Sequence, residues 1–284
     1  MSELLHPELV NNVPFVGRRI IRTLSKLADS SEASRETEDN VSVVVRTLNE
    51  AEKLESLLHD INAQKFQKEI EVIVVDNEST DHTTDVAFEY GANVVRIDRG
   101  DFTYPKSMNI GIDAASFDIV WLTVGHALPA TDQLLRAGVL RFNNSNIAGV
   151  YGEPLLPSVN ASRTERLIGV VADNRLKLGN RQETQAKLGT MAATSAMIRK
   201  AAWDELGHFD ERYEVGGEDT ALARLMLKAG YSLESEPLLS VHHSHQLGPI
   251  GSLRQLRRWL RTVKGPVSLD RENIADLRPH LDFS

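Results

Sequence analysis

Short apolar runs alternate with amphipathic stretches from residue 41 onwards. The runs at 41–45, 70–75, 94–97 and 119–123 are largely apolar on both faces, and they predict buried strands. Apolar residues recur at helical spacing between these runs, at 50–61, 79–90 and 105–115. Buried strands separated by helices are typical of a parallel sheet with right-handed crossovers. The pattern therefore predicts an α/β fold.

The rest of the chain is less regular and shows no internal repeat. Strands are predicted within 148–157, 190–198 and 238–242, and helices at 163–178, 200–206 and 218–229. These elements extend the predicted domain to residues 41–245.

Basic amphipathic segments flank this domain on both sides. Residues 1–40 predict a helical extension followed by a Ser- and Glu-rich linker, and residues 246–284 predict an amphipathic helix and a tail. Three roles remain open for these extensions: packing on their own core, pairing with another subunit in a homo-oligomer, or peripheral contact with an anionic membrane. Packing on protein is favoured.

Composition excludes several classes of function. The 284 residues carry a net charge of −8, which argues against general nucleic-acid binding. The absence of cysteine removes disulfides, thiolate metal sites and cysteine nucleophiles. No apolar run approaches the ~20 residues that span a bilayer, and prolines and asparagines interrupt the N-terminus where a signal peptide would need an apolar core. A cytoplasmic protein, peripheral at the inner membrane face if the basic ends bind lipid, is expected.

Polar residues follow three of the predicted strands. They occupy 46–50, 76–81 and 123–126, and ligands of open α/β sheets bind at such strand ends. Most of them also suit helix capping, but Asp76 ends its strand, so its carboxylate is expected to accept hydrogen bonds from a base or ribose. Glycine-rich dinucleotide, P-loop and nucleophile-elbow motifs are missing from the sequence.

Two adjacent carboxylates, Glu218 and Asp219, follow Gly216-Gly217 at the predicted start of a helix. A helix N-terminus orients acidic side chains, and glycines let a ligand approach the backbone. A carboxylate held in this way can serve as a general base.

Four segments in this order resemble the inverting GT-A glycosyltransferases of the large family 2-like group. They are Val43–Glu50, Val74–Asp81, the Asn-x-Gly helix within Phe102–Ile112, and Gly207–Arg224. The resemblance covers about residues 41–245. It implies a GT-A-like (Rossmann-like), mostly parallel sheet flanked by helices, with the nucleotide-sugar donor bound by 41–127 and the acceptor and catalysis handled by 148–245.

The resemblance also implies roles for individual residues. Asp219 would be the base that deprotonates the acceptor hydroxyl, with Glu218 binding the acceptor or orienting the site, and inversion would follow from one in-line displacement. The residues implied in donor binding are Thr47, Asn49, Glu50, Asp76, Lys106 and His126. The acceptor class stays open between carbohydrate, lipid-linked glycan and small molecule.

The chain departs from the family pattern after the fourth predicted strand. Family members usually carry an Asp-x-Asp pair there that meets Mn²⁺ or Mg²⁺, whereas this chain reads Thr123-Val124-Gly125-His126. Loss of carboxylates weakens a site for a hard divalent metal. Either His126 and His243 bind a transition metal, or no metal binds and Lys106, His126, His243 or an arginine offsets the leaving-group charge.

Two rival functions remain open, the first because of this departure and the second because nucleotidyltransferases also have an open α/β sheet. One is a catalytically inactive protein that binds a nucleotide sugar or acts as a scaffold. The other is a sugar-phosphate nucleotidyltransferase, which would be expected to carry a glycine-rich loop after the first strand. Residues 46–50 contain no glycine, so this second rival ranks lower.

Overall fold

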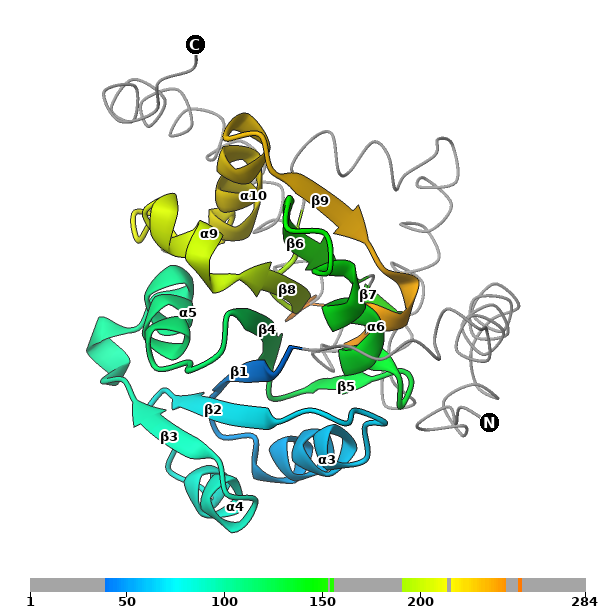
Figure 1. Cartoon of the computed structure of the whole chain (residues 1–284). Coiled ribbons are helices and arrows are strands. Elements are labelled where there is room, and N and C mark those ends of the chain that lie inside the picture. Colours follow the sequence, from blue (N-terminus) through cyan, green and yellow to red (C-terminus); the bar gives the residue numbers. More distant parts are fainter. Residues whose placement is uncertain (1–38, 153, 156–190, 214–215, 244–249, 252–284) are drawn as a thin grey trace.

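A seven-stranded sheet forms the centre of the molecule, with strand order β3-β2-β1-β4-β8-β6-β9 (Figure 1). The computed structural model describes residues 39–152, 154–155, 191–213, 216–243 and 250–251. The strands are β1 (Val41–Thr47), β2 (Ile70–Asp76), β3 (Asn93–Arg96), β4 (Ile119–Val124), β6 (Ile147–Tyr151), β8 (Ser195–Arg199) and β9 (Ser232–Ser235). All neighbours pair in parallel except β8, which runs antiparallel to β4 and β6. The predicted mostly parallel α/β fold is confirmed.

Helices cover both faces of this sheet. They are α3 (Ala51–Asn62), α4 (Thr83–Glu89), α5 (Tyr104–Asp113), α6 (Leu134–Arg141), α9 (Lys200–Glu205) and α10 (Glu218–Lys228), with 3₁₀ turns η2 (Arg99–Asp101) and η3 (Pro237–Leu239). Side chains of α3, α4 and α6 share one apolar core, and those of α5, α9 and α10 share another. Because successive strand residues point to opposite faces, Val43 and Val45 of β1 enter the first core and Val44 enters the second.

A small second sheet lies beside the end of β4. Its strand order is β5 (Ala127–Pro129), β10 (Val241–His243) and β7 (Pro154–Leu155). In the antiparallel pairing of β5 with β10, His243 is opposite Ala127. The histidine-rich segment near residue 243 is thereby brought to the carboxyl end of β4.

Local hydrogen bonding moves one predicted helix start. The helix predicted from Ser79 begins at Thr83, because Asp81 Oδ1 accepts hydrogen bonds from the Thr83 amide at 3.0 Å and from its hydroxyl. Residues 79–81 form a loop instead. Among the described elements, β5, α6, β9 and the short turns η2 and η3 had not been predicted. β9 reads Ser-Leu-Glu-Ser and lies at the sheet edge, so its composition gives little strand signal.

The flanking extensions fall almost entirely outside the described residues. The same holds for the helix predicted at 163–178, and only residues 250–251 of the C-terminal segment are described, both helical. The domain boundaries, membrane contact and homo-oligomer formation therefore stay predictions. Of the helices in the described part, none combines the length and apolar character that crossing a bilayer requires.

Gly111 allows helix α5 to lie directly on strands β1 and β2. A methyl group at this position would overlap the Val44 side chain and lie 2.9 Å from Val75 Cγ2. We expect Gly111→Ala to lower the free energy of unfolding by about 1–3 kcal/mol, since overpacking outweighs alanine's better helix propensity. Urea denaturation measures this. Gly100→Ala is the control, since nothing lies within 4 Å of its added carbon; equal stabilities of the two variants would contradict the expectation.

Candidate active site

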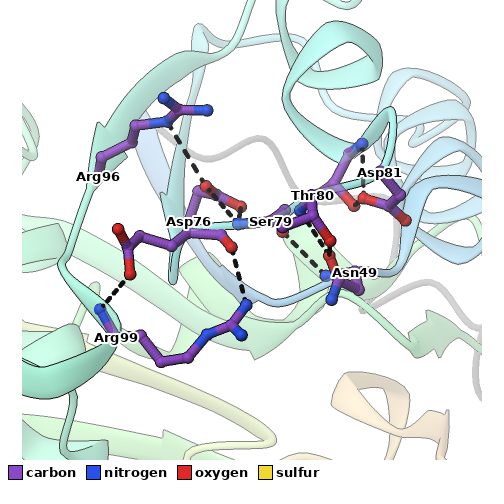
Figure 2. Close-up of polar contacts among 9 residues, drawn as sticks. Asn49, Asp76, Ser79, Thr80, Asp81, Arg96 and Arg99 are labelled. Carbon is purple, nitrogen blue, oxygen red and sulfur yellow. Dashed lines mark hydrogen bonds and ion pairs between the residues drawn. The ribbon is translucent and has the colours of Figure 1, made fainter.

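The loops that follow β1 and β2 are tied together through Asn49 (Figure 2). The Asn49 amide donates to Ser79 Oγ at 2.8 Å, and Asn49 Oδ1 accepts from the Thr80 amide at 2.7 Å. Asn49 has φ 51°, a left-handed conformation that asparagine tolerates better than most residues. The side-chain oxygen of Asn49 thus joins the two loops, and donor binding by this residue stays a prediction. Asn49 shapes this edge of the sheet.

Asp76 ends β2 beside Thr47 of β1, with which it is paired in the parallel register. Its side chain is fully buried, and both carboxylate oxygens accept from the Ser79 amide, at 3.3 and 3.1 Å. Arg96 Nε lies 3.7 Å from Asp76 Oδ2, and the Arg96 side chain is 64% exposed (Figure 2). Asp76 therefore fixes the turn that follows β2 and forms an ion pair with Arg96, whose side chain is largely exposed to solvent.

Thr47, Glu50 and His126 form one cluster at the ends of β1 and β4. The Thr47 hydroxyl donates to Glu50 Oε2 at 3.3 Å, and His126 Nδ1 lies 2.7 Å from Glu50 Oε1. Gly125 makes room for this contact, because a Cβ there would lie 2.7 Å from Glu50 Oε2 and 2.8 Å from Thr47 Oγ1. Three residues predicted to bind the donor are brought together.

His126 also stacks on His243, the other histidine predicted as a metal ligand. The ring centroids are 4.8 Å apart with 26° between the planes. Stacked rings lie face to face, so their nitrogens do not converge on one point between them. Within the described residues, no group of three or more histidine, aspartate or glutamate side chains is arranged to hold a metal ion. The described residues therefore contain no preformed three-ligand metal site, and the assignment of metal ligands to His126 and His243 stays a prediction.

Lys106 lies in the first turn of α5, where the Thr103 hydroxyl caps the helix by accepting from the Lys106 amide at 3.2 Å. Its ammonium group is 3.4 Å from Asp101 Oδ2, and both side chains are partly exposed. The place of Lys106 near the diphosphate or ribose stays a prediction.

Glu218 and Asp219 occupy the first turn of α10, as predicted. Gly216 and Gly217 precede them with φ 120° and 109°, values that favour glycine. Asp219 is half-buried; its Oδ2 accepts from the Ala193 amide at 3.2 Å and its Oδ1 from the Thr220 amide at 2.7 Å. These two amides fix the orientation of the carboxylate.

Both carboxyl groups have altered acidity. Burial raises the pKa of Asp219, although hydrogen bonds from Ala193 and Thr220 and the charge of Arg46 oppose the increase. Burial, followed by the negative charge of Asp219, raises the pKa of Glu218 to about 7. Glu218 is 4% exposed, and its Oε2 atom has no hydrogen-bond partner in the described structure. Perturbed carboxyl groups of this kind concentrate at functional sites.

Asn109 of α5 binds the backbone of Phe209, which precedes Gly216 and Gly217 in the chain. Asn109 Nδ2 donates to the Phe209 carbonyl at 2.9 Å, and its Oδ1 accepts from the Phe209 amide at 3.0 Å. Glu211 Oε1 accepts a further bond from Nδ2 at 3.2 Å. The Asn-x-Gly helix thus fixes the segment that leads into α10.

Arg46 connects the two halves of the site and was absent from the predicted donor-binding set. Its guanidinium carbon lies 4.4 Å from the centre of the Tyr104 ring. Burial lowers the pKa of Arg46, and the charges of Glu218, Asp219 and Glu50 partly oppose this decrease. The signal in the sequence was a single arginine directly after the apolar run of β1. Glu50 from the donor-binding half and Glu218 and Asp219 from the catalytic half therefore all act on the charge of Arg46.

The profile of glycosyl transferase family 2 matches residues 42–207, more than half of the chain. The chain belongs to this family. Together with the observed sheet, the match establishes a glycosyltransferase with the GT-A fold. The predicted family and enzyme class are confirmed.

Individual relatives and structures agree with this assignment. An O-antigen chain rhamnosyltransferase, WbaN of Salmonella anatum, is 28% identical over 193 residues, covering 65% of this chain and 61% of that protein. The glycosyltransferase AglE of Haloferax volcanii is 27% identical over 237 residues, covering 81% and 73%. The mannosyltransferase PcManGT from Pyrobaculum calidifontis, solved with GDP-Man and Mn²⁺, superposes with a TM-score of 0.61 at 18% identity, covering 87% of this chain and 69% of that one. This structural likeness shows the fold. The chain spans less than two thirds of the rhamnosyltransferase.

Proposed function

We propose that this glycosyltransferase moves a sugar from a nucleotide-diphosphate donor to an acceptor hydroxyl with inversion, and that Asp219 is the general base. The observation that carries the proposal is the position of Asp219. It is half-buried at a helix start, oriented by two backbone amides, and close enough to Arg46 at the end of β1 for their charges to interact. One site therefore combines a candidate base with the strand ends where donors bind.

The chemical step would be a single displacement. The acceptor hydroxyl transfers its proton to a carboxylate oxygen of Asp219 while the acceptor oxygen attacks the anomeric carbon. The bond from this carbon to the β-phosphate oxygen breaks, and the nucleoside diphosphate leaves. Attack opposite the leaving group inverts the anomeric configuration.

The donor would bind along the ends of β1, β2 and β4. The Thr47–Glu50–His126 cluster and the loop joined by Asn49 and Ser79 line this edge. A nucleotide-sugar donor is supported by the solved mannosyltransferase with GDP-Man, and a glycan acceptor by the O-antigen relative. Carbohydrate and lipid-linked glycan acceptors are thus the first to test. Mn²⁺ accompanies the donor in that mannosyltransferase, so its requirement must be measured here.

A thermal-shift screen tests donor binding first. Uridine, guanosine, thymidine, cytidine and adenosine diphosphates and their sugar conjugates would each be tested with EDTA, Mg²⁺, Mn²⁺ and Zn²⁺. A ligand at about 100 times its Kd stabilises the folded protein by about 2.7 kcal/mol, so Tm rises for the correct base. If no nucleoside diphosphate or sugar conjugate raises Tm under any condition, the proposal fails.

Product analysis then tests transfer. The donor identified by the screen would be incubated with carbohydrate and lipid-linked acceptors, and NMR would determine the anomeric configuration of the product. Retention of configuration would exclude the single displacement. Donor binding without transfer or hydrolysis would support the inactive, scaffold alternative, whereas pyrophosphate release from a nucleoside triphosphate and a sugar phosphate would support a nucleotidyltransferase.

A further inference from the structure

Arg46 occupies the centre of the site described above. It is the second-to-last residue of β1, beside Val75 of β2 and Val124 of β4 in the parallel register. Alternation along β1 places Arg46 on the same sheet face as Val44, which is the face covered by α5 and α10. Tyr104 of α5 packs against the guanidinium. The side chain thus lies between the strand ends and the start of α10.

The Arg46 guanidinium has an unpaired donor in the described structure. Its Nη1 atom is shielded from solvent and has no hydrogen-bond partner among the described residues. The charges of Glu218, Asp219 and Glu50 act on the pKa of Arg46, yet none of these three carboxylates accepts a hydrogen bond from its Nη1 atom. A buried donor left unpaired is costly, and an arginine cannot lose its proton to relieve that cost. The position is therefore suited to an anion that arrives with a ligand.

Among the described residues, Glu218 has an unpaired hydrogen-bond acceptor, whereas Arg46 has an unpaired donor. The Glu218 Oε2 atom is buried and lacks a partner in the described structure. A ligand that satisfies both side chains must carry an anionic oxygen for Arg46 and a hydroxyl donor for Glu218. A diphosphate joined to a sugar carries both.

The geometry of the displacement indicates that the anion bound by Arg46 is the leaving diphosphate. In an in-line displacement the leaving diphosphate lies on the opposite side of the anomeric carbon from the acceptor oxygen and the base, which here is toward the strand ends. Arg46 is a cation at these strand ends. Residues 123–129 contain no carboxylate for a metal ion, and a cationic side chain at the strand ends would supply positive charge near the diphosphate. Arginine binds phosphate oxygens through two N–H groups, and a preorganised cation stabilises charge developing on a leaving group.

We propose that Arg46 binds the diphosphate of the donor and stabilises the negative charge that develops on it as the sugar leaves. This inference rests on the proposed function. The positive charge that stabilises the leaving diphosphate would then come from an arginine of β1.

The test compares nucleoside diphosphate with nucleoside monophosphate. Isothermal titration would measure the Kd of each for the unaltered protein, Arg46→Met and Arg46→Lys, using the base that the screen identifies. We expect Arg46→Met to weaken diphosphate binding by roughly 10- to 100-fold and monophosphate binding by less than about threefold, because one charge-assisted contact is lost. Arg46→Lys should fall between. Arg96→Met is the matched control: Arg96 lies beside Asp76, so both ligands should change by the same factor.

Two results would overturn the inference. One is an equal loss of diphosphate and monophosphate affinity in Arg46→Met, as expected if Arg46 only supports the carboxylates of α10. The other needs only the unaltered protein and so does not depend on variants that fold: a preference for diphosphate that disappears in EDTA, which would assign the contact to a metal. Failure of the unaltered protein to bind any nucleoside diphosphate would instead reject the proposed function.

Discussion

Replacing Asp219 with asparagine is expected to lower the rate of sugar transfer by about 10²–10⁴-fold while leaving nucleoside diphosphate binding unchanged. Asparagine has the same shape but cannot accept a proton from the acceptor hydroxyl, and a positioned base contributes an acceleration of this size. Its carbonyl oxygen can still accept one of the two amide hydrogen bonds that orient Asp219. Initial rates with a labelled donor, together with the Kd of the diphosphate, measure the two effects separately.

Asp113→Asn is a suitable control for this variant. Asp113 is an exposed aspartate at the end of α5, so the same chemical change there should leave the rate within about twofold. Circular dichroism would establish that both variants are folded. A transfer rate for Asp219→Asn within threefold of the unaltered protein would mean that another group accepts the proton. Loss of diphosphate binding together with the rate would assign Asp219 to ground-state binding instead.

The sequence was informative wherever a pattern depends on near neighbours. The valine runs of β1 and β2 predicted buried strands because both faces are apolar, and both faces are covered by helices. Gly216-Gly217 followed by Glu218 and Asp219 predicted a helix start with two acidic residues, which the structure places at the first turn of α10. Backbone propensity and capping are local effects, so one segment contains all the information needed.

The sequence was less informative about contacts between distant segments. The side-chain oxygen of Asn49 holds the loop at Thr80, 31 positions away, a contact that no local pattern predicts. Arg46 was one of several polar residues after the first strand. Its unpaired Nη1 and the effect of Glu218 on its pKa depend on how α10 and α5 pack on the same face of the sheet, which no local pattern specifies. Sheet register and helix packing decide such contacts.

The second large effect concerns stability: Glu218→Gln is expected to stabilise the protein above pH 7. Burial and the adjacent Asp219 raise the pKa of Glu218 from 4.5 to about 7, so the folded protein holds this proton more tightly than the unfolded chain. Between these two values the folded state binds more protons, and the free energy of unfolding falls as pH rises. The decrease amounts to at most about 3 kcal/mol and is complete above the folded pKa. Glutamine stays neutral, so Glu218→Gln avoids it.

Urea denaturation at pH 5 and pH 8 tests this prediction. Glu218→Gln should be more stable than the unaltered protein by about 2–3 kcal/mol at pH 8 and by less than about 1 kcal/mol at pH 5. Asp219 also has a raised pKa, so some decrease of stability with pH should remain in the variant. Glu55→Gln on the exposed face of α3 is the control and should change stability little at either pH. Equal stability of Glu218→Gln and the unaltered protein at pH 8 would mean that Arg46 already neutralises the ionised Glu218, in which case Arg46 would be an ion-pair partner of α10 with less charge available for a diphosphate.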